Sequence, residues 1–252
     1  MPIKVGRVPD LNYEPFYFEM ERRGIQLREM PSNGVGPAVE KGEIDGGPVP
    51  LADCLDLEDR FNYVAGFCVT AWEKSGSMFL HSRKPIAELA GTSIAIPSGS
   101  DTSLSLLRVL LAHKYQVQPK AYVTLEDPND SLLLDGVQGL RRRRGVRDYP
   151  YRYDLVEEWN KWTGLPFVFA RWMVRQDIEA TDAALLENTL YVGLEEGVDA
   201  LFHLTEPRAN LLMLAKDVVE YIQGYRYYMG LSEYKSLELF RGYLAQLSTA
   251  QP

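Results

Sequence analysis

Residues 154–175 read DLVEEWNKWTGLPFVFARWMVR, and this pattern predicts a helix, a tight turn and a buried strand in succession. The first half is amphipathic and runs up to Gly164, which can adopt backbone angles that other residues avoid. Pro166 prevents the helix from continuing. The residues from Phe167 onward are bulky and apolar, apart from two arginines. The stretch therefore indicates a helix that leads through a turn into a strand of a buried sheet.

Predicted strands and helices alternate on both sides of this stretch. The strands are expected at residues 3–7, 25–30, 44–49, 63–70, 77–82, 93–97, 121–125, 132–134 and 167–174. The helices are expected at residues 16–23, 35–41, 102–115, 181–200, 209–222 and 232–247. Because the chain begins with a βαβαβ order, it is expected to form a parallel sheet with right-handed crossovers.

The order of these elements predicts an α/β protein with two lobes. The segment Arg83-Lys84-Pro85 is interpreted as the crossover into the second lobe, and the strand at residues 167–174 as the return. We therefore expect residues 1–84 and 170–252 to form lobe 1 and residues 85–169 to form lobe 2. Two α/β lobes joined by two crossovers are the plan of the type-2 periplasmic-binding-protein fold. In such a fold, loops at the carboxyl ends of the strands face a central ligand cleft.

The composition argues against several classes of function. The chain has 252 residues and a net charge of −8, from 35 acidic and 27 basic side chains, which argues against a nucleic-acid partner. No apolar run approaches the roughly 20 residues needed to span a bilayer, so no membrane partner is expected. Cys54 and Cys68 lack metal-binding spacing and the histidines are scattered, so no metal site is predicted. Two unpaired thiols and a start without a signal-like segment favour a cytoplasmic protein.

The segment SGSDTS at residues 98–103 is the first candidate site. It follows a predicted strand and precedes an amphipathic, leucine-rich helix. A helix N-terminus offers free backbone N–H groups and the positive end of the helix dipole, which together suit an anion. Hydroxyls of Ser100, Thr102 and Ser103 would add donors around a carboxylate. The alternative is that Ser100 or Asp101 merely caps the helix.

Three further loops are candidates for the cleft. Asn12 follows the first strand, and its amide supplies a donor and an acceptor for a hydroxyl or carboxylate, although it cannot act as a strong base. Ser77 stands at the start of another strand, and Val49 follows two glycines that allow close backbone approach to a ligand. Each has a structural alternative, namely an Asx-turn at Asn12, a closed turn at Ser77 and a strand-to-helix bend at residues 46–50.

Two conspicuous clusters are given structural interpretations. The basic run at residues 141–144, with Arg147, is isolated in an acidic chain and is interpreted as a solvated turn, although it would also help to steer an anionic substrate. The tyrosines at positions 221, 225, 227 and 228 are interpreted as packing at a helix end.

Several strings taken together resemble chorismate dehydratases of the futalosine route to menaquinone. That family typically has a Gly-Arg-Ile/Val strand, a Tyr-Leu-Asn loop, a Ser-Val-Leu-Leu-Phe-Ser strand and a Ser-Arg-Thr-Ser turn before a leucine-rich helix. This chain has GRV at residues 6–8, DLN at 10–12, SMFLHS at 77–82 and SDTS at 100–103. Residues 154–175 are similar to the corresponding family passage almost throughout. The resemblance covers most of the first 175 residues in order.

The resemblance implies a carbon–oxygen lyase that removes water from chorismate and yields 3-[(1-carboxyvinyl)oxy]benzoate. A proton leaves the ring carbon that bears the enolpyruvyl ether, the neighbouring hydroxyl departs, and aromatisation drives the reaction. Neither a metal nor another cofactor is implied, because positioning and electrostatics can carry much of such catalysis. A carboxylate of the substrate is implied to help take the proton. The resemblance gives Asn12 the role of orienting the reacting groups, and gives Ser77, Ser100, Thr102 and Ser103 the role of holding carboxylates.

Two candidate positions depart from the family pattern. Asp10 stands where the family usually has tyrosine, and Asp101 where it usually has arginine, so two additional carboxylates are expected near a dianionic substrate. Asp101 is therefore a second catalytic candidate, as a new acid or base. The family's Ile-Gly-Asp corresponds here to Leu134-Asp135-Gly136. The alternative function is a non-catalytic binding protein for a small anionic ligand, or a divergent dehydratase with another substrate.

Overall fold

The computed structural model describes residues 2–99 and 101–249, and the chain divides into two compact units. The first unit contains the residues up to Thr70, Val168–Ala209 and Met213–Gly230. The second unit contains Ala71–Phe167, Asn210–Leu212 and the residues from Leu231 onward. The first unit is therefore assembled from segments that lie far apart in the sequence.

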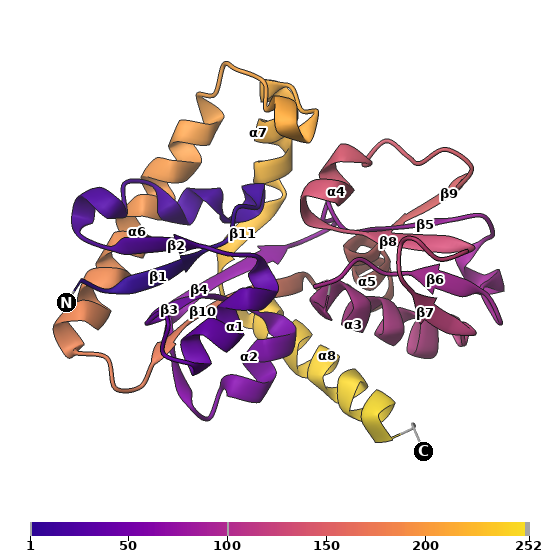
Figure 1. Cartoon of the computed structure of the whole chain (residues 1–252), viewed down its shortest axis with the longest axis horizontal. Coiled ribbons are helices and arrows are strands. Elements are labelled where there is room, and N and C mark those ends of the chain that lie inside the picture. Colours follow the sequence, from indigo (N-terminus) through magenta and orange to yellow (C-terminus); the bar gives the residue numbers. More distant parts are fainter. Residues whose placement is uncertain (1, 100, 250–252) are drawn as a thin grey trace. The chain divides into compact units, whose positions relative to one another are not determined.

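A mixed six-stranded sheet forms the centre of the first unit (Figure 1). Its strands, in spatial order, are β11 (Tyr225–Tyr228), β4 (Phe61–Ala71), β10 (Phe167–Arg175), β3 (Gly46–Pro50), β1 (Lys4–Arg7) and β2 (Gln26–Glu29). β1 is parallel to β2 and β3, whereas β10 is antiparallel to β3, with Ala170 opposite Pro50. The parallel arrangement of β1, β2 and β3 is as predicted. The strand next to β3, β10, comes from much later in the chain.

Helices cover both faces of the first sheet. They are η1 (Leu11–Tyr17), η2 (Glu21–Arg23), α1 (Ser32–Glu40), α2 (Leu51–Leu57), α6 (Ala180–Phe202) and α7 (Ala215–Gln223). Trp172 of β10 packs against Phe16 of η1, with ring centroids 5.2 Å apart. Pro48 lies opposite Trp172. The residue before it, Gly47, faces Val35 of α1. Because neighbouring strand residues point to opposite faces, η1 and α1 lie on opposite sides of the sheet.

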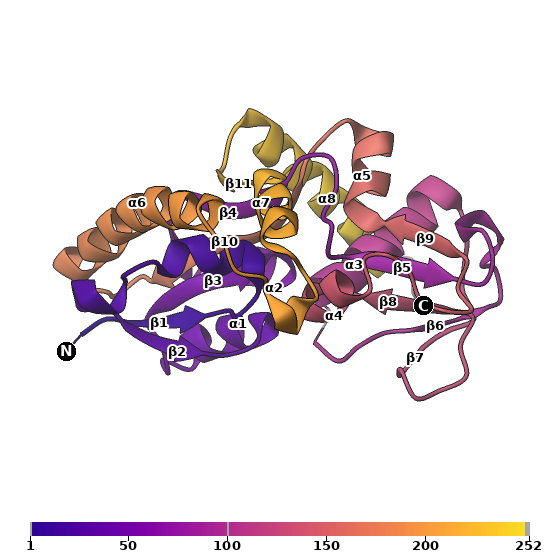
Figure 2. The same ribbon diagram turned by 90° about the horizontal axis from the view of Figure 1, so that it is seen from above.

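A mixed five-stranded sheet forms the centre of the second unit. Its strands, in spatial order, are β7 (Ala121–Val123), β6 (Ser93–Ala95), β8 (Ser131–Leu134), β5 (Phe79–Ser82) and β9 (Tyr151–Asp154). Figure 2 shows these five strands one after another in the same order. β6 is parallel to β7 and β8, and β5 is antiparallel to β8 and β9. Each sheet thus has three parallel strands followed by one antiparallel strand, which confirms the predicted α/β class.

The opening stretch of the sequence supplies the core of the second unit. The helices of this unit are η3 (Ile86–Glu88), α3 (Asp101–Val109), the π-helix η4 (Leu110–Tyr115), α4 (Gly136–Arg141), α5 (Leu155–Thr163) and α8 (Leu231–Thr249). Helix α5 ends at Gly164, whose φ is 72°, and β10 starts at Phe167, so the predicted helix, turn and strand are confirmed. Trp159 of α5 is fully buried against Phe240 of α8. Its indole Nε1 donates to the Pro166 carbonyl at 3.1 Å and to Ser236 Oγ at 3.0 Å.

The passage into the second unit lies earlier than the sequence indicated. Residues 71–84 were assigned to lobe 1, yet β5 pairs with β8 and β9 of the second sheet. Pro85 does interrupt the chain, but it does so between β5 and η3, inside the second unit. The chain changes unit at Ala71, at the end of the continuous strand β4, where no proline or glycine signals a break.

Three local interpretations differ from the structure. The helix expected at residues 16–23 is replaced by the two short 3₁₀ segments η1 and η2, separated by Glu19 at a positive φ of 51°. The tyrosines of residues 225–228 form strand β11 rather than a helix end. Arg143 is half-buried and donates to the carbonyls of Leu140 and Leu212 at 2.9 and 2.8 Å, so only the rest of its basic run is a solvated turn.

Within the described residues, no helix combines the length and the apolar character that crossing a membrane requires.

Candidate functional site

The candidate residues of the second unit gather at one edge of its sheet. β6 and β8 are parallel, so the loops that follow them leave from the same edge. β5 runs in the opposite direction, and Phe79 at its start lies opposite Leu134 at the end of β8. Ser77 therefore lies at the same edge as Asp135, and the loop after β6 leads into α3 with Thr102 and Ser103. Ser100 lies outside the described residues.

Ser103 is already engaged by a carboxylate. Its side-chain Oγ donates to Oδ2 of Asp135 at 2.5 Å, and Ser103 is buried. Asp135 precedes α4 without capping that helix through its side chain. Since the hydroxyl hydrogen of Ser103 is directed to Asp135, Ser103 holds the start of α3 against the loop after β8. Asp135 belongs to the Leu134-Asp135-Gly136 segment, and the sequence contains no signal that connects it to Ser103.

Ser77 is held in a turn that another serine closes. Ser75 Oγ accepts hydrogen bonds from the backbone N–H groups of Ser77 and Met78, at 3.2 and 2.8 Å. On the other side, a Cβ added at Gly139 of α4 would lie 1.8 Å from the Ser77 carbonyl oxygen. Ser75 therefore closes the turn. Ser77 is 5 % exposed and lies at the same edge of the sheet as Asp135.

The position of this turn depends on Asp154. Its carboxylate accepts from the backbone N–H groups of Ser75 and Gly76, at 3.0 and 2.7 Å, and from the hydroxyl of Ser75 at 3.0 Å. It also caps α5 by accepting from the backbone N–H groups of Val156 and Glu157. An aspartate before an amphipathic helix indicates a cap, but no signal in the sequence connects it to Ser75.

Asp101 is the first residue of α3, and its side chain is exposed. A carboxylate in the first turn of a helix interacts favourably with the helix dipole. Thr102 is half-buried, so burial increases along the first three residues of α3, from exposed Asp101 to buried Ser103.

Asn12 is a buried polar residue of the first unit. β1 and β3 are parallel, so the loops after Arg7 and Pro50 leave from one edge of the first sheet, and η1 with Asn12 follows β1. Asn12 is only 6 % exposed, and its side-chain amide makes no hydrogen bond with any residue that the structure describes. An Asx-turn requires such a bond, so that alternative is not supported. Neither amide atom is among the fully buried side-chain atoms that lack a partner, so the amide keeps contact with solvent and is open to a ligand.

The segment around Val49 is occupied by protein contacts. Val49 is fully buried, and its carbonyl accepts a hydrogen bond from Sγ of Cys54 at 3.0 Å. A Cβ at Gly46 would lie 2.6 Å from the Met173 carbonyl oxygen, and one at Gly47 would lie 3.0 Å from Val35. The two glycines therefore allow β3 to pack against β10 and α1, which is a structural role.

Burial governs the titratable groups next to these loops. Burial, followed by the charge of Asp10, raises the pKa of the Tyr13 phenol well above its usual value. Burial likewise raises the pKa of the Cys54 thiol to about 12. Both groups are therefore neutral near pH 7, so Cys54 does not act as a thiolate nucleophile. Among the described residues, no group of three or more His, Cys, Asp or Glu side chains is placed to hold a metal ion.

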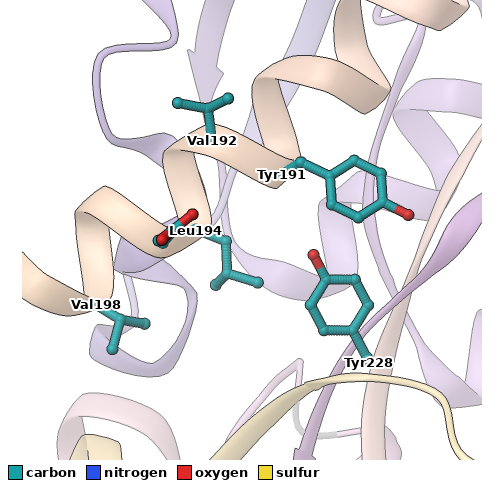
Figure 3. A pocket seen from close by; sticks show the side chains of 6 residues that line it. Tyr191, Val192, Leu194, Val198 and Tyr228 are labelled. Atoms are coloured by element: carbon teal, nitrogen blue, oxygen red, sulfur yellow. The ribbon is translucent and has the colours of Figure 1, made fainter.

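An open groove on the first unit lies apart from these candidates. It has a volume of about 490 Å³ and is lined by Tyr191, Val192, Leu194, Glu195, Val198 and Tyr228. Figure 3 shows the side chains of α6 along it, with the ring of Tyr228 facing Tyr191. Its lining is mostly apolar and includes none of the predicted site residues, so it is not the candidate site.

A family model described as menaquinone biosynthesis matches residues 3–246, nearly the whole chain. The chain belongs to the menaquinone biosynthesis family. This membership confirms the family resemblance predicted from the sequence.

Solved structures that resemble this menaquinone-biosynthesis family member show the fold. Protein AF1704 from Archaeoglobus fulgidus is 14% identical, covers 98% of each chain and has a TM-score of 0.74. The alkanesulfonate-binding protein SsuA from Xanthomonas axonopodis pv. citri, bound to MOPS, is 15% identical over 98% of this chain and 92% of its own, with a TM-score of 0.64. A conserved gene product of Candida albicans with the generic periplasmic binding protein fold is 10% identical over 100% and 92%, with a TM-score of 0.57. The predicted periplasmic-binding-protein-like fold is therefore confirmed.

Proposed function

We propose that this protein removes water from chorismate to give 3-[(1-carboxyvinyl)oxy]benzoate in menaquinone biosynthesis. The C–H bond at the ring carbon that bears the enol ether breaks, the neighbouring C–O bond breaks, and the proton and hydroxyl leave as water. The observation that carries this proposal is Asn12, a residue only 6 % exposed whose amide makes no hydrogen bond with a described residue, in a chain that matches the family over residues 3–246.

Asn12 orients the reacting groups in this proposal. Its amide can donate to a carboxylate or hydroxyl through NH₂ and accept from a hydroxyl through its carbonyl oxygen. Its surroundings exclude most water, so a hydrogen bond to the reacting group is stronger there than in solvent. Asn12 cannot remove the proton itself, and we assign that step to a carboxylate of the substrate.

In the second unit, Ser77 and Thr102 hold a substrate carboxylate. Ser77 lies at the sheet edge, and Thr102 lies in the first turn of α3, where backbone N–H groups favour an anion. Ser103 has a different role because its hydrogen is directed to Asp135. We therefore assign Ser103 and Asp135 to positioning the start of α3. Ser100 remains a proposed substrate contact, whereas Val49 is fully buried and is assigned a structural role.

The two departures from the family pattern affect binding to different degrees. Asp101 is exposed, so water and salt screen its repulsion of a dianion. Asp10 is half-buried, so solvent screens its charge less than that of Asp101. We propose Asp101 as a second acid or base, and Asp101→Asn tests this by removing the charge at nearly constant shape.

Turnover of chorismate tests the proposal. Purified protein is incubated with chorismate, and products are followed by liquid chromatography with mass detection, beside an active chorismate dehydratase. Enzyme-dependent loss of one water is the expected result, and it should disappear in Asn12→Ala. A folded protein that leaves chorismate unchanged would contradict the proposed reaction.

A second candidate is binding without chemistry. It is favoured by the fold that this chain shares with SsuA, which binds a sulfonate, and by the two additional carboxylates. Calorimetry distinguishes the two, because a binding-only protein would give a saturable heat with chorismate and no product. We also propose a cytoplasmic location, because neither Cys54 nor Cys68 forms a disulfide in the described part of the chain and a reducing compartment keeps thiols in that state.

A further inference from the structure

The second unit carries a pocket of about 630 Å³ away from the candidate site. It is lined by Arg108, Leu111, Ala112, Gln116, Val117, Gln118, Pro119, Lys120, Ala121, Tyr122 and Leu247. These residues come from α3, η4, the loop before β7, the start of β7 and α8. Three helical elements and an edge strand therefore form its walls.

The pocket lies at the opposite end of the strands from Ser77. Its loop precedes β7, and Ala121 at the start of β7 pairs with Ser93 at the start of β6. The candidate site residues follow β6 and β8 instead. Because these strands are parallel, the two locations are at opposite edges of the sheet, and the pocket is separate from the candidate site.

The polar lining of the pocket is cationic. Arg108 and Lys120 form no ion pair or side-chain hydrogen bond with any residue in the described part of the chain. The side chains of Gln116 and Gln118 add amide donors, and the lining contains no aspartate or glutamate. In a protein with a net charge of −8, such a concavity attracts an anion.

The remaining lining suits a flat apolar body. Leu111 and Val117 are buried, and Tyr122 presents its ring with 39 % of its surface exposed. Burial raises the pKa of the Tyr122 phenol to about 12, opposed by the nearby charge of Arg108. The phenol is therefore protonated near pH 7 and can donate a hydrogen bond beside the guanidinium.

The loop that forms the pocket is fixed by backbone hydrogen bonds. Gln116 has a positive φ of 55°, and the next residue, Val117, donates to the Leu111 carbonyl at 2.8 Å. The Gln118 carbonyl accepts from Gly91 at 3.1 Å, and the Lys120 N–H donates to Thr92 at 2.7 Å. The pocket is thus preformed, which reduces the entropic cost of binding.

We propose that this pocket binds a small aryl carboxylate. The carboxylate lies between Arg108 and Lys120, and the aromatic ring lies against Tyr122, Leu111 and Val117. An inorganic anion such as phosphate would use the cations but leave the apolar wall unused. The proposal goes beyond the dehydration of chorismate and does not rest on it.

Photolabelling with 4-azidobenzoate, mapped by mass spectrometry of peptides, tests the proposal. We expect label on the peptide that contains Gln116–Tyr122, and protection by excess benzoate but not by inorganic phosphate at the same concentration. The double variant Arg108→Gln/Lys120→Gln should lower this labelling about tenfold, because it removes both charged partners of the carboxylate. The matched control Arg147→Gln/Lys84→Gln removes two exposed cations elsewhere in the same unit and should label like the wild type.

Each outcome decides the proposal. Both pairs lack ion-pair partners among the described residues, so circular dichroism should show the double variant and its control equally folded. Label outside this peptide, or equal labelling in the double variant and the wild type, would overturn the pocket as a carboxylate site. Protection by phosphate as strong as that by benzoate would overturn its preference for an aryl ligand.

Discussion

The carboxylate of Asp154 binds the backbone N–H and the hydroxyl of Ser75, 79 residues earlier in the chain, each at 3.0 Å. The same carboxylate caps α5. One buried side chain therefore fixes the first turn of a core helix and the turn that holds Ser77. Loss of Asp154 is expected to affect both stability and the candidate site.

Asp154→Ala should lower the free energy of unfolding by about 3 kcal/mol, because it removes a helix cap and leaves buried N–H groups unpaired. Urea denaturation measures this. Asp177→Ala is the control, since that side chain is 76% exposed, and it should change stability by less than about 0.5 kcal/mol. Equal stabilities of the two variants would show that the Asp154 network contributes nothing.

Asn12→Ala should lower kcat/KM for chorismate about 100-fold, because the amide is assigned to the reacting groups. Its effect on unfolding should stay below about 1 kcal/mol, since no described residue loses a hydrogen bond. Steady-state kinetics and urea denaturation measure the two effects. Asn33→Ala in α1 is the matched control, and an Asn12→Ala protein with control-like turnover would remove Asn12 from the mechanism.

His81 should make the protein acid-sensitive. The residue is 0 % exposed and neither ring nitrogen has a hydrogen-bond partner among the described residues. Burial, and then the charges of Arg152 and Arg142, lower the pKa of His81 from 6.5 to about 4. The unfolded chain binds this proton more readily, so the stability that neutral His81 provides is complete above pH 6.5 and is lost as the pH falls toward 4.

His81→Leu should flatten the pH dependence of unfolding in this window by about 3 kcal/mol. It should also be at least as stable as the wild type at pH 7, because two buried unpaired nitrogens disappear. Urea denaturation at several pH values measures both effects. His203→Gln changes an exposed histidine and should leave the curve unchanged, whereas an unaltered slope in His81→Leu would disprove the assignment.

Gly139→Ala and Gly242→Ala should have opposite effects. A Cβ at Gly139 would lie 1.8 Å from the Ser77 carbonyl oxygen, so this variant must move α4 or the Ser77 turn and should lose about 3 kcal/mol of stability. Gly242 of α8 has open space around its Cβ position, so alanine there should add about 0.5–1 kcal/mol. Thermal unfolding compares the pair, and a stabilised Gly139→Ala protein would contradict the packing of α4 on Ser77.

The sequence predicted those features that arise from local chemistry. Gly164 and Pro166 mark the end of the helix, so the bounds predicted for the helix and the following strand are nearly correct. Asn12 follows the first strand as predicted, but it lies in the 3₁₀ helix η1 rather than in a loop. Its lack of a partner depends on packing and required the structure.

The sequence did not predict features that depend on distant residues. The hydrogen bonds from Ser103 to Asp135 and from Ser75 to Asp154 join segments with no shared pattern. β11 was missed because its four aromatic and basic residues lack an apolar alternation, although Tyr225 and Tyr227 are the buried pair. The passage at Ala71 was misplaced because the chain changes unit without a turn.

The anchoring of Trp159 by Ser236 and Phe240 has a consequence for the order in which the protein can mature on the ribosome. The second sheet is complete in sequence at Asp154, but its buried tryptophan lacks its contacts with Ser236 and Phe240 until α8 has been synthesised. The first sheet likewise waits for Tyr225–Tyr228 as its last strand. Neither hydrophobic core can close before nearly the whole chain has emerged, so the nascent protein depends on protection from aggregation until the last helix is available.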